Sequence, residues 1–176
     1  MTPDEKIEHC KFVIGRYDFY YDSVNNKANF WLAFNTFAIG LVLTTYKDLT
    51  EKLIVPCIST WFNWGLVAFL AVAITASFII LKASWPHLNT RKRASLQSRS
   101  LIYFEDVAAV KFVDLQNALN NADDQQRQKD FATQVHQLAT GLSRKYQRLA
   151  IAGRLMAVEL GLLAYLIGLI GIGKIL

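Results

Sequence analysis

The chain has 176 residues, of which 53% are hydrophobic and 19% charged, and it carries a formal net charge of +5 at pH 7. This length corresponds to one domain, and the positive mean hydropathy of +0.22 comes from three apolar blocks. The basic balance does not require a nucleic-acid partner, because basic cytoplasmic flanks of membrane spans produce the same excess. We therefore predict a membrane protein that does not bind nucleic acid.

The first 46 residues follow the pattern of one long helix. Apolar side chains recur at steps of three and four from Ile7 to Trp31, which is the spacing of one helical face. Asp4 and Glu5 stand where acidic residues complement a helix N-terminus. We predict a cytoplasmic amphipathic helix over 1–28 that continues into a transmembrane helix over 29–46.

A second apolar block follows a short polar stretch. Residues 64–81 carry no charge, and a helix needs about 20 apolar residues to cross a hydrocarbon core of about 30 Å. We predict an external loop over 47–61 and a second transmembrane helix over 62–82.

The remaining chain predicts a polar helical region and a third span. Leu101 to Leu119 repeat apolar residues at helical spacing, so one amphipathic helix is expected over 99–120. Phe131 to Ala152 form another such stripe, and a helix is expected over 124–173. Gly141 weakens this helix without ending it. The predicted ranges are a cytoplasmic sensor region at 83–148 and a third transmembrane helix at 149–173.

The orientation follows from the basic residues beside the spans. The segment 82–148 carries eleven Lys and Arg residues, whereas the loop 47–60 carries two. Because cytoplasmic flanks are enriched in these residues, we expect the N-terminus and the sensor region inside and the C-terminus outside. The predicted fold is all-α, with three spans and with long first and last helices that extend into a cytoplasmic helical bundle.

Polar groups inside the third block allow two interpretations. Arg154 and Glu159 either line a pore or a gate, or they reach the cytoplasmic interface while the span begins near Leu160. Asn35 in the first block favours an interhelical hydrogen bond.

Motifs for enzymatic chemistry are absent from the sequence. No phosphate-binding glycine loop, HExxH, GxSxG or CxxC is present, and the three histidines are scattered. We therefore predict a protein that is not an enzyme and that holds no metal.

Three segments combine cations with aromatic and hydroxyl or amide side chains. A nucleotide needs cations for its phosphate and an aromatic or apolar surface for its base. The segments are Arg99–Phe104, Ser143–Tyr146 and Tyr20–Lys27. Many helical proteins contain such combinations, so this chemistry alone identifies no ligand.

The same regions resemble a known family, the Pycsar transmembrane effectors. The resemblance rests on three runs in one order along the chain: YYDSVNNKANFWLAFNTF (20–37), SLIYFEDVA (100–109) and DFATQVHQLATGLSRKYQRLAIAGRLM (130–156). The spacing from Asp22 to Lys27 and Ala28 matches the entry into that family's first span.

The resemblance implies a function in bacterial antiphage defence. A partner pyrimidine cyclase would make cyclic CMP or cyclic UMP, and the effector would bind it on the cytoplasmic side and impair the inner membrane, causing abortive infection. A homo-oligomer is expected, because three spans alone cannot enclose a water-filled path. The alternative is a constitutive oligomeric channel or scaffold without nucleotide sensing.

The nucleotide-binding candidates are chemical choices within the matching segments. Arg99 and Lys145 are the candidates for the phosphate, Tyr103 and Tyr146 for the base, and Lys27 for an additional contact. Lys145 lies on the apolar stripe of its helix, where an ammonium needs a partner. A ligand phosphate is one possible partner, and a structural ion pair with Asp22, Glu105 or Asp106 is the other.

Overall fold

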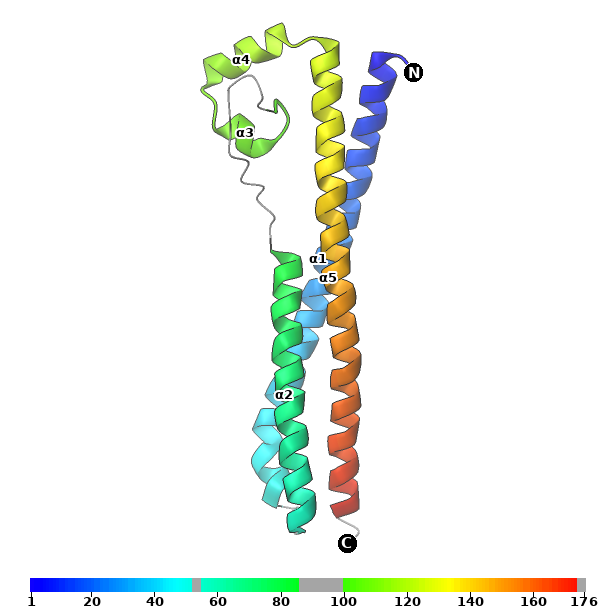
Figure 1. Cartoon of the computed structure of the whole chain (residues 1–176). Coiled ribbons are helices and arrows are strands. Elements are labelled where there is room, and N and C mark those ends of the chain that lie inside the picture. Colours follow the sequence, from blue (N-terminus) through cyan, green and yellow to red (C-terminus); the bar gives the residue numbers. More distant parts are fainter. Residues whose placement is uncertain (52–54, 86–99, 174–176) are drawn as a thin grey trace. The chain divides into compact units, whose positions relative to one another are not determined.

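The computed structural model describes residues 1–51, 55–85 and 100–173. The elements in chain order are α1 (Pro3–Glu51), α2 (Pro56–Ser84), α3 (Phe104–Ala108), α4 (Phe112–Asn121) and α5 (Asp124–Gly173) (Figure 1). Every regular element in these ranges is a helix, so the predicted all-α class is confirmed.

Both long helices begin at side-chain caps. At the start of α1, the backbone N–H of Thr2 donates to Glu5 Oε2 (2.8 Å), and that of Glu5 donates to Thr2 Oγ1 (3.2 Å). This reciprocal pair is a capping box. At the start of α5, Asp123 Oδ1 accepts the backbone N–H of Gln126 (2.6 Å). These caps satisfy backbone donors that a helix start leaves without internal partners.

The two apolar stripes predicted for these helices face protein. No member of either stripe is fully exposed, as expected if the amphipathic face is what stabilises a helix. The stripe residues are Ile7, Cys10, Ile14, Tyr17, Tyr21, Val24, Ala28 and Trp31 in α1, and Phe131, Val135, Leu138, Leu142, Lys145, Leu149 and Ala152 in α5.

The single helix predicted over 99–120 is wrong. Two short helices, α3 and α4, are separated at Ala109–Lys111, where Lys111 is extended (φ −66°, ψ 145°). β-branched Val107, Val110 and Val113 around the break lower helix propensity. Before α3, Ser100 Oγ accepts the backbone N–H groups of Ile102 (3.1 Å) and Tyr103 (2.9 Å). Such side-chain contacts compete with helix formation.

The chain divides into two compact units, and the first consists of Met1–Asp22 and Pro86–Ser143. Within it, Tyr21 Oη donates to Leu138 O (3.0 Å), which joins α1 to α5. A Cβ at Gly141 would collide with the Tyr21 hydroxyl, so the absence of a side chain there makes room for this contact. Asp130 Oδ2 on α5 accepts the backbone N–H of Leu101 (2.7 Å).

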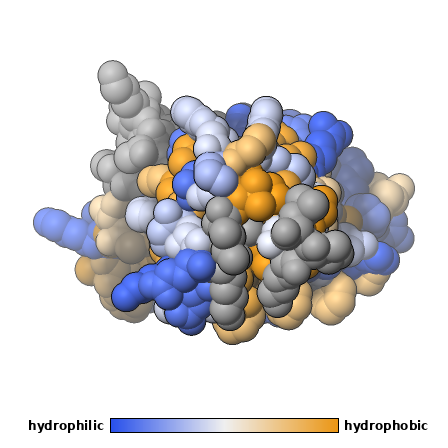
Figure 2. All heavy atoms as spheres, turned by 90° about the horizontal axis from the view of Figure 1, so that it is seen from below, coloured by the Kyte–Doolittle hydropathy of each residue, from blue (hydrophilic) through white to orange (hydrophobic). Residues whose placement is uncertain are grey.

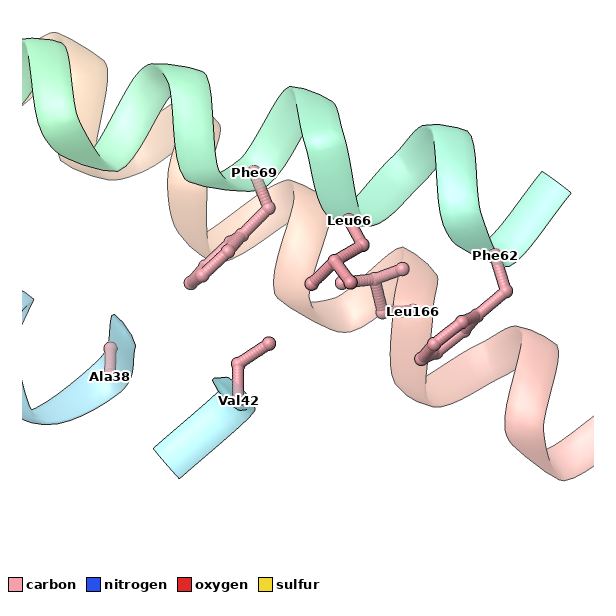
Figure 3. Close-up of a cluster of buried hydrophobic side chains, with 6 residues drawn as sticks. All are labelled: Ala38, Val42, Phe62, Leu66, Phe69 and Leu166. Carbon is pink, nitrogen blue, oxygen red and sulfur yellow. The ribbon is translucent and has the colours of Figure 1, made fainter. Parts of the chain in front are cut away.

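The second unit consists of Ser23–Trp85 and Arg144–Leu176. Segments of α1 and α5 run parallel in it, and α2 runs antiparallel to both (Figure 1). A buried apolar cluster joins the three helices, with both phenylalanines turned toward the other two helices (Figure 3). Its members are Ala38, Val42, Phe62, Leu66, Phe69 and Leu166.

Three helices, α1, α2 and α5, are long and apolar enough to cross a membrane. Their outward side chains are mostly apolar and exposed, Phe37 and Phe78 among them, as expected for surfaces that contact lipid. Figure 2 shows the molecule from the end where α1 leads toward α2, and orange apolar residues lie there among hydrophilic ones. The helices α1 and α2 extend to Glu51 and from Pro56, so helical structure covers most of the range predicted as the loop 47–61.

Candidate functional site

Lys145 is almost fully buried in the second unit, with 4% of its surface exposed. It lies on α5 where three helices meet, and its Nζ donates to oxygens on the other two. The acceptors are Ala83 O (2.8 Å) and Ser84 O (3.3 Å) on α2 and Asn25 Oδ1 (3.0 Å) on α1. An ammonium has three N–H donors, and these contacts are sufficient to occupy all of them.

Arg148, one turn further along α5, binds the same end of α2. Its Nη1 donates to Lys82 O at 2.8 Å. The last carbonyls of a helix lack internal partners and carry the negative end of the helix dipole. Lys145 and Arg148 therefore supply both the missing donors and the complementary charge. We call this arrangement of Asn25, Lys145 and Arg148 on the carbonyls of residues 82–84 the α2 clamp.

The clamp has an electrostatic cost. Burial lowers the pKa of the Lys145 ammonium below its ordinary value, and the nearby positive charge of Arg148 lowers it further. Both effects disfavour the charged form. The oxygen atoms of Asn25, Ala83 and Ser84 that accept from this ammonium are neutral, and an anionic oxygen forms a stronger hydrogen bond with an ammonium than a neutral one does.

The other nucleotide candidates are distributed over both units. Tyr146 and Lys27 are exposed residues of the second unit. Tyr103 belongs to the first unit, where its ring lies 5.1 Å from that of Phe104 in a tilted arrangement. Arg99 lies outside the described residues. The structure therefore joins Lys145 to the predicted segment Tyr20–Lys27 through Asn25.

Two members of the α2 clamp were not predicted as site residues. Asn25 stood inside the aromatic and polar segment 20–27, but nothing in its spacing singled it out. Arg148 was counted only as a basic flank of the third span. The acceptors on α2 are backbone carbonyls, which every residue carries, so no sequence signal marks them.

The predicted polar residues of the spans separate into two environments. Asn35 is fully buried, and its Nδ2 donates to Ala73 O (2.9 Å) and Ser77 Oγ (3.2 Å) on α2. Glu159 is 2% exposed and faces the interior of the second unit. Arg154, on the same helix, is exposed. The side chain of Glu159 therefore faces protein, whereas that of Arg154 does not.

A family model described as the Pycsar effector protein domain matches residues 9–172 of this chain. That range includes nearly all of α1 and α5 and the whole of α2, α3 and α4. Comparisons with curated proteins and with solved structures give no match.

Proposed function

Since this chain belongs to the Pycsar effector protein family and is thereby an antiphage defence effector, we propose that a cyclic pyrimidine mononucleotide activates it to impair the bacterial inner membrane. The ligand is cyclic CMP or cyclic UMP, made by a partner pyrimidine cyclase during infection. The observation that carries the proposal is the family match, which covers both compact units. The match also confirms the resemblance drawn from three segments of the sequence.

The α2 clamp supports a role for Lys145 in ligand binding. A phosphate oxygen forms a stronger, charge-assisted hydrogen bond with an ammonium than a carbonyl does. A cyclic nucleotide that took Lys145 as a partner would therefore compete with Ala83 O, Ser84 O and Asn25 Oδ1. Tyr146 and Lys27 remain candidates for contacts with the base and the phosphate, as do Tyr103 and Arg99.

The same competition supplies a mechanism for activation. A ligand shifts an equilibrium only if it binds one state more tightly than the other. In the clamped state Lys145 is occupied by α2, whereas in a released state it is available to the phosphate. Ligand binding thus favours release of α2 from α5, which changes the packing of the segments that cross the membrane.

Oligomerisation and orientation complete the proposal. None of the residues 112–121 of α4, all described, is buried, and Phe112, Val113 and Leu119 are exposed there. An amphipathic helix that leaves large apolar side chains exposed is suited to contact another copy. The N-terminus and the sensor region lie in the cytoplasm, the protein acts without enzymatic chemistry, and it requires no resident cofactor.

Ligand binding to detergent-solubilised full-length protein tests the sensing step. We expect calorimetric binding of cyclic CMP or cyclic UMP and none of a cyclic dinucleotide. Lys145→Ala is expected to lose binding per folded molecule and to lose phage protection, whereas Arg144→Ala, which removes the exposed neighbouring cation, keeps both.

Two outcomes would contradict the proposal. Absence of heat with both mononucleotides on folded wild-type protein would overturn nucleotide sensing and favour a constitutive channel or scaffold. Unchanged affinity in folded Lys145→Ala would remove Lys145 from the ligand site and leave it a structural residue.

A further inference from the structure

The interior of the second unit contains a second polar group of a different kind. Among the described residues, the buried side-chain atoms without a hydrogen-bond partner are Asn35 Oδ1 and the two carboxyl oxygens of Glu159. Both residues are at least 98% buried. Unpartnered buried polar atoms are rare and costly, and an ionisable residue inside a membrane span usually has a function.

The packing register places these two residues at one level. The parallel helices α1 and α5 meet where a Cβ on Gly153 would lie 2.9 Å from Trp31 Cη2. Asn35 is four residues beyond Trp31, about 6 Å along its helix, and Glu159 is six beyond Gly153, about 9 Å along α5. By this register, Asn35 and Glu159 lie within about one helical turn of each other along the axis of the unit.

The contacts of α2 give the same level independently. A Cβ on Gly65 would lie 3.0 Å from Leu166 Cδ2, and α2 runs antiparallel to α5. Ala73, the hydrogen-bond partner of Asn35, is about 12 Å from Gly65 along α2, and Glu159 is about 10 Å from Leu166 along α5. We call the shared level of Asn35, Ala73 and Glu159 the polar layer.

The polar layer is rich in acceptors and poor in donors. Because Ala73 O can only accept, the atom of Asn35 that faces it must be the amide nitrogen, and this fixes the amide orientation. Asn35 Oδ1 is then an acceptor, as are both oxygens of an ionised Glu159. One proton on Glu159 changes this balance, because a protonated carboxyl donates one hydrogen bond, and Asn35 Oδ1 is at the right level to accept it.

The described residues of α1, α2 and α5 beside the polar layer supply no positive charge to it. Residues 28–46 of α1 and 57–81 of α2 contain no Asp, Glu, Lys, Arg or His, and their titratable side chains are Tyr46 and Cys57, near the far end of the unit. On α5, Arg154 is exposed and Tyr165 lies two turns beyond Glu159. A metal cation such as Ca²⁺ would need about six to eight oxygen ligands, more than the three oxygens of the layer that have no hydrogen-bond partner.

We propose that Asn35 and Glu159 form a proton-binding site in the second unit and that the activated effector moves protons across the membrane through it. The resting chain holds the proton on Glu159, hydrogen-bonded to Asn35 Oδ1. Release of α2 opens the layer to water, the proton leaves to the side of lower proton concentration, and a proton from the other side replaces it. The transport step rests on the proposed function, and the binding site does not.

Infrared spectroscopy tests the binding site without any ligand. The difference spectrum between wild type and Glu159→Gln at neutral pH is expected to show the C=O stretch of a protonated carboxyl group. In Asn35→Leu this band is expected to shift to the higher frequency of a carboxyl group without that hydrogen bond. A difference spectrum with ionised carboxylate bands alone would overturn the site.

Proteoliposomes with an internal pH-sensitive dye test the transport step. With cyclic CMP or cyclic UMP, wild type is expected to collapse an imposed pH gradient, and Glu159→Gln is expected to lose this flux while it still binds the nucleotide. Val158→Gln, which adds the same amide to the exposed neighbouring position, is the matched control and should keep the flux.

The outcomes separate this inference from the proposed function. Transport through the polar layer would be overturned if Glu159→Gln kept the full proton flux. It would also be overturned if wild type and Glu159→Gln both released a large trapped dye in parallel with the proton flux. Absence of any nucleotide response in wild type would overturn the activation mechanism and transport with it, whereas the infrared measurement decides the proton site by itself.

Discussion

The α2 clamp and the polar layer each contain a buried ionisable side chain of α5 in the same three-helix unit. They differ in whether that side chain has hydrogen-bond partners. Lys145 is buried among three oxygen atoms that accept its hydrogen bonds. Glu159 is buried slightly more completely, and neither of its oxygens has a hydrogen-bond partner. The two side chains are 14 residues apart, about 21 Å along one helix.

The difference separates two reasons for burying an ionisable group. A fully hydrogen-bonded group fixes the geometry around it, and its removal leaves buried partners unsatisfied. A group without partners contributes no such restraint, and its burial costs free energy. We infer that the α2 clamp fixes the packing of the three helices. The polar layer instead serves the proton movement that follows when the helices separate.

The largest expected effect is the loss of stability in Lys145→Ala. The substitution leaves Asn25 Oδ1 and two helix-terminal carbonyls without their donor, and the cost is expected to be roughly 2–4 kcal/mol. Thermal and denaturant unfolding in detergent measure it, with Arg144→Ala as the control. If Lys145→Ala lowered the free energy of unfolding no more than Arg144→Ala does, the clamp would be no more stabilising than an exposed polar contact.

Asn35→Leu is expected to have a smaller effect, about 1–2 kcal/mol. It removes the hydrogen bonds to Ala73 O and Ser77 Oγ and the acceptor proposed for Glu159, while leucine fills a similar volume. Interhelical hydrogen bonds in membrane proteins contribute about 0.6 kcal/mol on average. Unfolding of the Asn35→Leu, Glu159→Gln and double variants measures their coupling, and strict additivity would contradict a contact between the two residues.

Tyr21→Phe, in the first unit, measures how much one neutral hydrogen bond contributes to the free energy of unfolding. Loss of the contact with Leu138 O is expected to cost about 1 kcal/mol at neutral pH. Burial raises the pKa of Tyr21 above 10.0, and the charge of Asp18 raises it further. The unfolded chain therefore loses this proton first as the pH rises.

The stability that Tyr21 contributes is fully present below pH 10.0, the ordinary pKa of the group, and declines as the pH rises through the higher folded-state pKa. The stability difference between wild type and Tyr21→Phe should shrink over that window. A pH-independent difference in denaturant unfolding would contradict the linkage.

The smallest expected effect is that of Glu159→Gln on stability. If Glu159 already carries a proton, both side chains offer a donor to Asn35, and the free energy of unfolding should change by less than about 0.5 kcal/mol. A gain of several kcal/mol would instead indicate that the substitution relieves a buried charge. Melting temperatures in detergent at neutral pH distinguish the two cases.

The sequence predicted the long helices well because their signals are local and repeated. The stripe from Ile7 to Trp31 and the start at Asp124 placed α1 and α5 within a few residues of their observed bounds. The break between α3 and α4 was missed because no proline or glycine marks it. Spacing alone does not report the extended backbone of Lys111.

The candidate site was predicted less completely, for a physical reason. Lys145 was identified because an ammonium on an apolar stripe needs a partner, and the partners considered were carboxylates or a phosphate. The structure supplies two backbone carbonyls and an amide oxygen among its contacts. The antiparallel register of α2 decides which of its last carbonyls lie beside Lys145. This register is a tertiary property that no local sequence pattern encodes.

The use of backbone carbonyls in the α2 clamp has a consequence for how such a chain can diverge. Any amino acid at position 84 presents the same carbonyl oxygen to Lys145, and position 83 is restricted mainly in size, because Ala83 is fully buried. Substitutions can therefore accumulate at the end of α2 without changing what Lys145 binds. Selection on the clamp then acts mainly on the three side chains of Asn25, Lys145 and Arg148, and homologous chains can diverge widely in sequence while they keep the α2 clamp.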